Sequence, residues 1–140
     1  MFLEKQLYIK RSKITSAGKG LFTKKKIPKG TRIAEYKGNI TTWKKVTQSG
    51  QFNAYVYYIN RNTVIDAKRR LKAFARYAND AKGITRIKGV NNNSEYVKDK
   101  GKIFVDAVKD IPAYGEILVG YGKEYWDVIK SNNKLALKEP

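Results

Sequence analysis

The densest aromatic stretch of this 140-residue sequence is Glu116-Ile117-Leu118-Val119-Gly120-Tyr121-Gly122-Lys123-Glu124-Tyr125-Trp126. It follows a turn at residues 111–115, where Pro fixes φ and Gly permits the positive φ that a turn can need. Its apolar beginning, residues 117–120, predicts a buried strand. The rings fit a core aromatic cluster, because most of the ten tyrosines in a chain of this length must be packing residues. A functional interpretation of the stretch therefore depends on the rest of the sequence.

Elsewhere the apolar residues come in short bursts between Gly, Pro, Asn or Lys clusters, a pattern that favours short strands over long helices. It predicts a mostly β fold with eight strands, at Leu7–Lys10, Gly20–Thr23, Arg32–Tyr36, Ala54–Ile59, Thr63–Asp66, Glu95–Lys98, Ile103–Asp106 and Ile117–Gly120.

Two segments show the three-and-four spacing of an apolar helix face, and we expect helices at Lys68–Ala78 and Glu124–Lys130. The face of the first consists of Leu71, Phe74, Ala75 and Ala78. A third helix could begin at Thr41-Thr42-Trp43, with Thr41 or Thr42 as its N-cap, and Gly50 would end it.

The composition fits one globular domain and excludes several chemistries. A chain of this length builds one core, and 41% apolar residues are enough to fill it. Without Cys the chain has no disulfides, thiolate nucleophiles or thiolate metal sites, and without His it lacks the usual metal ligand and general base. Its start does not resemble a signal peptide, and nowhere do about 18 apolar residues run together. We expect a soluble, intracellular protein without membrane association.

Two polar motifs are each open to two interpretations. Ser16-Ala17-Gly18-Lys19-Gly20 predicts either a hairpin turn or bare backbone that a ligand can approach, without the spacing of a phosphate-binding loop. Ala75-Arg76-Tyr77-Ala78-Asn79-Asp80-Ala81 fits a helix C-cap followed by a turn. Alternatively, Asn79 lies in a pocket, where its amide would donate to and accept from an amino-acid-like ligand.

Four separated signals, taken together and in order, resemble the SET-domain family of protein lysine methyltransferases. They are Gly18-Lys19-Gly20, Glu35-Tyr36-Lys37-Gly38, Val64-Ile65-Asp66-Ala67 with Arg76-Tyr77-Ala78-Asn79, and Glu116–Tyr121. The resemblance spans about residues 9–130 and implies a single SET domain over residues 1–140, with 131–140 as a C-terminal tail. It also implies several short β-sheets and a few short helices around a knot-like crossing, in which the terminal motif passes beneath the central one.

The resemblance further implies a site for S-adenosylmethionine, which would leave as S-adenosylhomocysteine. By position, Lys19 and Gly20 would offer backbone contacts to this cofactor, and Asn79 would hold its methionine part. The other cofactor-binding candidates are Tyr77, Asp80, Tyr121 and Trp126. Tyr121 is also the catalytic candidate, as the terminal tyrosine beside the methyl-transfer axis, and Asn93 is the candidate for a second asparagine of the site. The candidate walls of the substrate-lysine channel are Tyr36, Tyr57, Tyr58, Val119 and Tyr125.

Methyl transfer from a sulfonium to a lysine amine is compatible with the missing residue types. It is an in-line displacement that needs alignment and a neutral nucleophile, without a covalent enzyme intermediate, a metal or a histidine. A free lysine has a pKa of about 10.4, so neutralising it at pH 7 costs roughly 4 kcal/mol. A narrow aromatic channel lowers this cost by removing water from the ammonium, and the sulfonium charge acts in the same direction. We expect no metal in the site.

Several positions depart from the family pattern. Asp80 stands where the family usually has His, so the packing around the crossing depends on hydrogen bonds that Asp80 accepts from nearby backbone or from Lys82. Gly120 stands in place of an acid. Val119 stands in place of Phe or Tyr, which would leave room for di- and trimethyl-lysine. Because the chain has no cysteines for a C-terminal zinc cluster, residues 123–140 would supply an apolar lid instead.

The segment 121–127 looks most like the branch of the family that acts on histone H3 tails, which includes small stand-alone viral forms. That branch implies a histone-tail substrate and a location in the nucleus or on chromatin, the host nucleus in the viral case. The formal net charge of +18 is densest at Lys24-Lys25-Lys26 and at Lys68-Arg69-Arg70 with Lys72, and it favours contact with DNA or a nucleosome. The same charge repels a cationic tail, which leaves room for a non-histone substrate.

An alternative from another class is a small basic DNA-binding or chromatin-associated protein without catalysis, whose contacting element would be the helix at 68–78. This alternative explains the charge but gives no role to Asn79 or Tyr121. Self-association into a homodimer could also complete the site.

Overall fold

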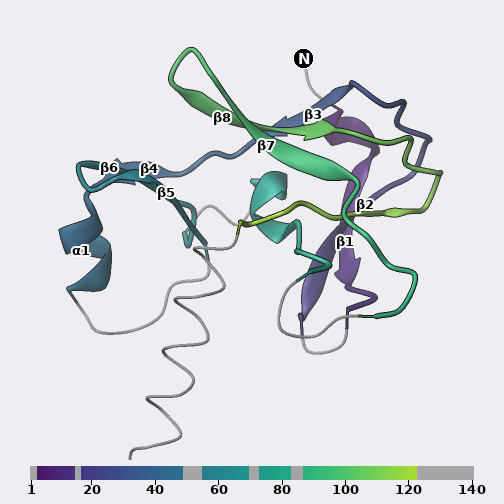
Figure 1. Ribbon diagram of the computed structural model, residues 1–140, viewed down its shortest axis with the longest axis horizontal. Coiled ribbons are helices and arrows are strands. Elements are labelled where there is room, and N and C mark those ends of the chain that lie inside the picture. Colours follow the sequence, from purple (N-terminus) through teal and green to yellow (C-terminus); the bar gives the residue numbers. More distant parts are fainter. Residues whose placement is uncertain (1–2, 15–16, 49–54, 70–72, 83–86, 123–140) are drawn as a thin grey trace, which may run out of the picture.

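The described residues form three small β-sheets, and residues from all three contribute to the main buried core (Figure 1). The structure is a computed structural model, and it describes residues 3–14, 17–48, 55–69, 73–82 and 87–122. Within these residues nine strands are present, three in each sheet. The predicted mostly β fold is therefore confirmed.

Each sheet joins strands from distant parts of the chain, and the pairings are antiparallel. The first sheet has the order β1-β2-β9 and consists of β1 (Leu7–Arg11), β2 (Lys19–Thr23) and β9 (Glu116–Ile117). The second has the order β3-β8-β7 and consists of β3 (Arg32–Glu35), β7 (Ser94–Asp99) and β8 (Lys102–Ala107). The third has the order β4-β6-β5 and consists of β4 (Asn39–Thr41), β5 (Val56–Asn60) and β6 (Thr63–Asp66).

The eight predicted strands all correspond to observed ones. The last is shorter than predicted, because β9 ends at Ile117 and the next two residues form isolated bridges instead. The strand missing from the prediction is β4, since Asn39-Ile40-Thr41 offers one apolar residue and that residue is exposed. It forms because its backbone pairs with β6, which sequence alone does not reveal.

The core lies where the three sheets meet. Leu21 of β2 is paired with Ile117 of β9, and both belong to a buried cluster with Val105 of β8 and Ile65 of β6. Burial of a side chain of this size contributes about 1.5–3 kcal/mol. Because these residues come from distant parts of the sequence, their burial fixes the strand ends from which the polar motifs extend.

The helices within the described residues are few and short. α1 (Trp43–Thr47) begins where predicted, because the Thr42 side chain accepts a hydrogen bond from a backbone N–H of the first turn (3.3 Å). η1 (Glu4–Gln6) and η2 (Phe74–Tyr77) are short 3-10 turns. No helix in the described part of the chain has the length and apolarity that a membrane crossing requires. The predicted helix at Glu124–Lys130 lies outside the described residues.

The predicted helix over Lys68–Ala78 is wrong, since residues 68 and 69 form a turn and, among the described residues of this segment, only those of η2 are helical. The cause is Arg76, whose buried guanidinium donates hydrogen bonds to the backbone oxygens of Ala67 (2.7 Å) and Lys68 (2.6 Å). The same group lies 3.8 Å from the centroid of the Tyr55 ring. An α-helix would hold residues 67 and 76 about 13 Å apart along its axis, too far for these contacts.

Candidate active site

The segment that follows β9 runs between two other parts of the chain. On one side the Val119 N–H donates to the backbone oxygen of Asn79 (2.8 Å), beside a parallel bridge between Asn79 and Leu118. On the other side the N–H groups of Asn93 and Ser94 donate to the Leu118 oxygen (2.9 and 3.0 Å). In Figure 1 this yellow-green segment passes through the middle of the molecule. The terminal motif is thus held against the central motif.

Asn93 anchors this segment with its side chain. Its Nδ2 donates to the backbone oxygen of Glu116 (2.9 Å), and its Oδ1 accepts from the Leu118 N–H (3.0 Å). The pairing of β9 with β2 ends at Ile117. The side-chain amide of Asn93 therefore holds the backbone at the point where strand pairing stops. Asn93 positions the terminal motif.

The glycine motif meets the central motif through one side chain. Asn79 Nδ2 donates to the backbone oxygen of Lys19 (2.9 Å), 60 positions earlier in the chain. The preceding Gly18 has φ of +72°, a conformation that L side chains rarely adopt. Lys19 and Asn79, both predicted to bind the cofactor, are therefore neighbours.

Gly20 is required by a neighbouring carboxylate. A Cβ at this position would overlap Oε2 of Glu116. That buried carboxylate accepts hydrogen bonds from Ser12 Oγ (2.6 Å) and the Lys13 N–H (2.9 Å). Gly20 thus makes room for a side chain that ties β9 to the loop between β1 and β2. The positioning role of Glu116 is missing from the sequence-based prediction, although the residue belongs to the terminal motif.

Asp80 holds the backbone of the terminal tyrosine. The residue is 6% exposed, and one of its carboxylate oxygens accepts from the Tyr121 N–H (2.8 Å). The other oxygen accepts from the Lys82 N–H and from Asn92 Nδ2, both at 2.8 Å. Asn92 in turn accepts from the Ala81 N–H (2.7 Å). The hydrogen bonds on which the packing around Asp80 was expected to depend are therefore present.

Four tyrosine rings from separate elements form what we call the tyrosine cluster: Tyr36, Tyr57, Tyr96 and Tyr121. Tyr96 contacts the other three, with ring centroids 6.0 Å from Tyr36, 5.0 Å from Tyr57 and 6.3 Å from Tyr121. Tyr36 and Tyr57 are 5.9 Å apart. These separations are those of interacting aromatic pairs. Tyr96 is not among the sequence-predicted residues.

The cluster is partly buried, and two of its residues show the effect. Burial raises the pKa of the Tyr57 phenol above its usual value. The Tyr121 hydroxyl donates a short hydrogen bond to the backbone oxygen of Ala78, and its backbone N–H donates to Asp80. Tyr121 is therefore fixed both at its backbone and at the tip of its ring. A group that enters between these rings loses water on several sides.

The other predicted channel and cofactor residues are not members of the cluster. Tyr58 is 48% exposed and packs edge-on against Trp43 at 5.3 Å, because neighbouring residues of a strand point to opposite faces and Tyr57 faces the cluster. The Tyr77 ring lies under the guanidinium of Arg76 (4.8 Å). Val119 is fully buried in the core against which three of the cluster rings pack. Tyr125 and Trp126 lie outside the described residues.

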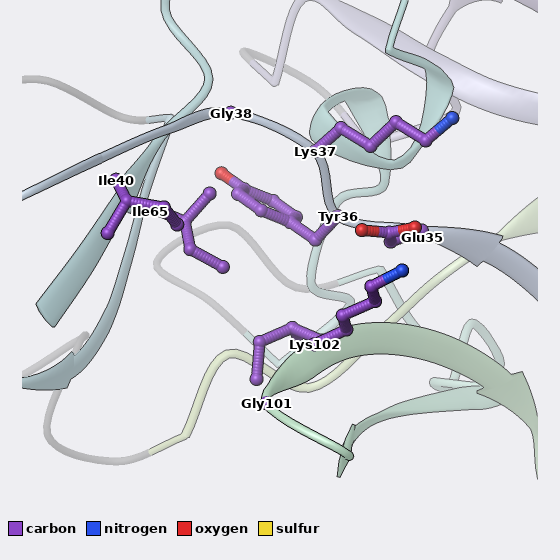
Figure 2. Close-up of a pocket in the computed structure, with 9 residues that line it drawn as sticks. Glu35, Tyr36, Lys37, Gly38, Ile40, Ile65, Gly101 and Lys102 are labelled. Carbon is purple, nitrogen blue, oxygen red and sulfur yellow. The ribbon is translucent and has the colours of Figure 1, made fainter.

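A cavity of about 240 Å³ adjoins Tyr36 between the end of β3 and the β7–β8 hairpin. Figure 2 shows the Tyr36 ring extending toward Ile40 and Ile65, while the Lys102 amine points toward Glu35. The complete lining is Glu35, Tyr36, Lys37, Gly38, Ile40, Ile65, Gly101, Lys102 and Ile103. Among the described residues no group of three or more His, Cys, Asp or Glu is arranged to hold a metal ion.

Comparison with known proteins agrees with this architecture. Residues 18–122 match the SET domain family, so the chain belongs to that family. It is a protein-lysine N-methyltransferase of the SET type. The structure is similar to that of the methyltransferase domain of human PR domain-containing protein 2, with a TM-score of 0.62 and 25% sequence identity over 82% of this chain and 76% of that chain. No curated protein matches this sequence.

Proposed function

We propose that this enzyme transfers a methyl group from S-adenosylmethionine to a lysine of a histone H3 tail. One observation supports the methyl transfer most strongly: three predicted site residues from distant segments lie close together. Asn79 binds the Lys19 oxygen with its side chain and the Val119 N–H with its backbone, while Tyr121 is hydrogen-bonded to the residues on either side of Asn79. The glycine motif, the central asparagine and the terminal tyrosine thus form one constellation.

The residues present suit this cofactor. At the glycine motif a positive-φ glycine and the Lys19 carbonyl leave main-chain atoms near the surface, and Asn79 offers an amide in fixed orientation. These groups fit an amino-acid moiety with an ammonium and a carboxylate. When bound, the cofactor supplies an electrophilic methyl group on a sulfonium. Lys19, Asn79 and Tyr121 would hold it, and the position of Trp126 in the sequence adds a candidate beyond the described residues.

The tyrosine cluster would prepare the nucleophile. A lysine ammonium that enters among Tyr36, Tyr57, Tyr96 and Tyr121 loses part of its hydration, which lowers its pKa and favours the neutral amine. The raised pKa of Tyr57 indicates that this environment disfavours charge. Because Tyr121 is fixed through Asp80 and Ala78, its ring can orient the entering side chain without moving.

The histone H3 substrate is supported by the resemblance of the terminal stretch to the branch that acts on such tails, and a nuclear location follows from the same proposal. We test activity and substrate together. The protein is incubated with labelled S-adenosylmethionine and, separately, H3 tail peptide, H4 tail peptide and an acidic non-histone protein. We expect label on the H3 peptide. Label on the acidic protein alone would overturn the histone assignment, and no label on any acceptor would count against the activity.

A second candidate is DNA contact through the basic surface, favoured by the net charge of +18. A homodimer that completes the site is a further proposal, and sedimentation at the concentrations of the activity assay tests it.

A further inference from the structure

Lysines from three separate segments gather at one edge of the molecule, which we call the lysine edge. Its exposed members are Lys5, Lys24, Lys25, Lys26, Lys29 and Lys109. The loop after β2 and the turn before β9 lie side by side there, at the opposite end of the molecule from the β4-β6-β5 sheet (Figure 1). Three of the six lysines form the Lys24-Lys25-Lys26 run, and none of these three belongs to the candidate active site.

Backbone hydrogen bonds hold the segments of the lysine edge together. The Lys24 N–H donates to the oxygen of Gln6 (2.8 Å), which brings Lys5 beside the loop after β2. Ile27 and Ile111, both fully buried, exchange two backbone hydrogen bonds of 2.8 Å. The lysines are therefore presented by a fixed scaffold.

Acidic groups offset little of this charge. Within the described residues 5–6, 24–30 and 107–115 the one acid is Asp110. It accepts from the Lys29 N–H (2.7 Å), and it lies 3.6 Å from Lys26 Nζ. The Lys29 N–H, followed by the charge of Lys26, lowers the pKa of Asp110. The nearby Glu4 lies 3.9 Å from Lys37. Six lysines against one aspartate leave a local surplus of five positive charges.

An exposed ring stands in the same surface. Tyr114 is 67% exposed, and its φ of +64° is unusual for a residue other than glycine. Its N–H donates to the Thr23 oxygen (2.6 Å), directly before the lysine run. The strained backbone thus presents a phenol to solvent beside Lys24, and a tyrosine hydroxyl is among the groups that contact phosphate and sugar in DNA complexes.

We propose that the lysine edge binds the phosphate backbone of duplex DNA without reading its sequence. Ammonium groups on long stems suit phosphate contacts, whereas base readout favours the planar fork of Arg. A membrane surface fits less well, because Tyr114 is the single large exposed hydrophobic residue among the described parts of this edge. The inference rests on the proposed function in one respect. The histone that carries the cationic tail is itself bound to DNA, so DNA contact would bring the cationic enzyme close to a tail that its charge repels.

The test compares two variants with the same change of net charge. Lys24→Glu/Lys25→Glu alters the lysine edge, and Lys44→Glu/Lys45→Glu alters two adjacent exposed lysines of α1 at the opposite end of the molecule. Affinity for a fluorescent duplex is measured by anisotropy at several salt concentrations, without S-adenosylmethionine. We expect the edge variant to lose about tenfold or more in affinity and its log–log salt slope to become shallower by about two, the loss expected for two phosphate contacts. The α1 variant should stay within about twofold of the parent protein, since few contacts are removed.

Equal losses in both variants would overturn the proposal, because the binding would then follow net charge rather than the edge. Preferential binding to vesicles containing phosphatidylserine would also overturn it. Tyr114→Asn gives a second readout, because asparagine tolerates positive φ and should retain the fold. We expect weaker DNA binding. Unchanged binding would show that Tyr114 does not contribute to the DNA-binding surface.

Methylation of a short free peptide separates this inference from the proposed function. We expect the edge variant to methylate that peptide at the parent rate. A parent protein that binds DNA through the edge but methylates no peptide would contradict only the enzymatic proposal. A parent protein that methylates peptide but binds DNA equally well with either variant would contradict only the DNA surface.

Discussion

The backbone N–H of Tyr121 donates a 2.8 Å hydrogen bond to a carboxylate oxygen of Asp80, 41 positions earlier in the chain. The second oxygen of Asp80 is held by the Lys82 N–H and by Asn92 Nδ2. The SET family usually has His at this position. Here a carboxylate, with no donor capacity of its own, collects three donors instead. Asp80 and Asn92 together make a clamp that sets the position of the terminal tyrosine.

Replacement of Asp80 by Ala should impair both stability and turnover. Three donors lose their acceptor, and an unsatisfied buried group costs about 1–3 kcal/mol, so we expect a loss of about 3 kcal/mol in the free energy of unfolding. Where the variant is folded, kcat should fall by about tenfold with the peptide KM little changed, because a displaced Tyr121 affects alignment. Denaturant unfolding and steady-state kinetics measure these effects.

The matched control is Asp99→Ala, which removes a partly exposed carboxylate paired with Arg32 on the β7–β8 hairpin. Such ion pairs contribute about 0–1 kcal/mol, and kcat should be unchanged. If Asp80→Ala affects kcat no more than this control, Asp80 does not position the tyrosine.

Tyr121→Phe should abolish most turnover and leave cofactor affinity within a few fold. The change removes the hydroxyl that donates to the Ala78 oxygen, while the Asp80 hydrogen bond to the backbone stays. The ring then loses the hydrogen bond at its tip, beside the proposed methyl-transfer axis. Calorimetry with S-adenosylhomocysteine measures binding and labelled methyl transfer measures rate. Unchanged turnover would remove the phenol from the mechanism.

Gly20→Ala and Gly120→Ala should differ sharply. An added methyl at Gly20 overlaps the Glu116 carboxylate and displaces its hydrogen bonds to Ser12 and Lys13, so both thermal stability and cofactor affinity should fall. At Gly120 the methyl would stand 3.6 Å from Asn92 Nδ2, an ordinary contact. We expect a melting temperature several degrees lower for the first variant, since about 1–3 kcal/mol is typical of such overpacking. Equal melting temperatures would contradict the assigned role of Gly20.

Most strands of this fold can be predicted from sequence because each is a burst of apolar residues between turn formers. β4 escapes, since Ile40 is exposed and the strand depends on pairing with β6. The failure at Lys68–Ala78 has another cause. Its apolar spacing is helical, but Arg76 turns inward to bind the oxygens of Ala67 and Lys68, and a periodicity argument assigns a cation to the surface.

The candidate site was likewise predictable only in part. Motif order identifies Lys19, Asn79 and Tyr121, which the fold brings together. Tyr96 escapes prediction because it stands in a polar strand, and its three partner rings come from elements far away in the sequence. Tyr58 is assigned to the channel because local sequence does not tell which face of β5 points inward. The inclusion of Tyr96 in the cluster and the exclusion of Tyr58 from it both depend on how the strands pair and pack in the folded protein.

The size of Val119 predicts the product. It stands where the family often has Phe or Tyr, and it is fully buried in the core against which Tyr57, Tyr96 and Tyr121 pack. We expect the parent enzyme to form di- and trimethyl-lysine, and Val119→Ile to shift the distribution toward fewer methyl groups because one added methylene narrows the site. Mass spectrometry of the peptide products at completion measures this. Monomethyl-lysine as the sole product of the parent enzyme would contradict the hypothesis.

The pKa of Tyr57 predicts a stability change at high pH. Burial disfavours the phenolate, so the folded state raises this pKa above the value of about 10 in the unfolded chain. The group therefore stabilises the fold fully below about pH 10, and this contribution is lost as pH rises through the raised pKa. Tyr57→Phe should lessen the decline in unfolding free energy above about pH 10. Tyr58→Phe is the matched control, because that neighbouring ring is exposed, and it should leave the decline unchanged. The same decline in both variants would show that the cluster does not exclude water from Tyr57, and the desolvation argument for the substrate lysine would lose its support.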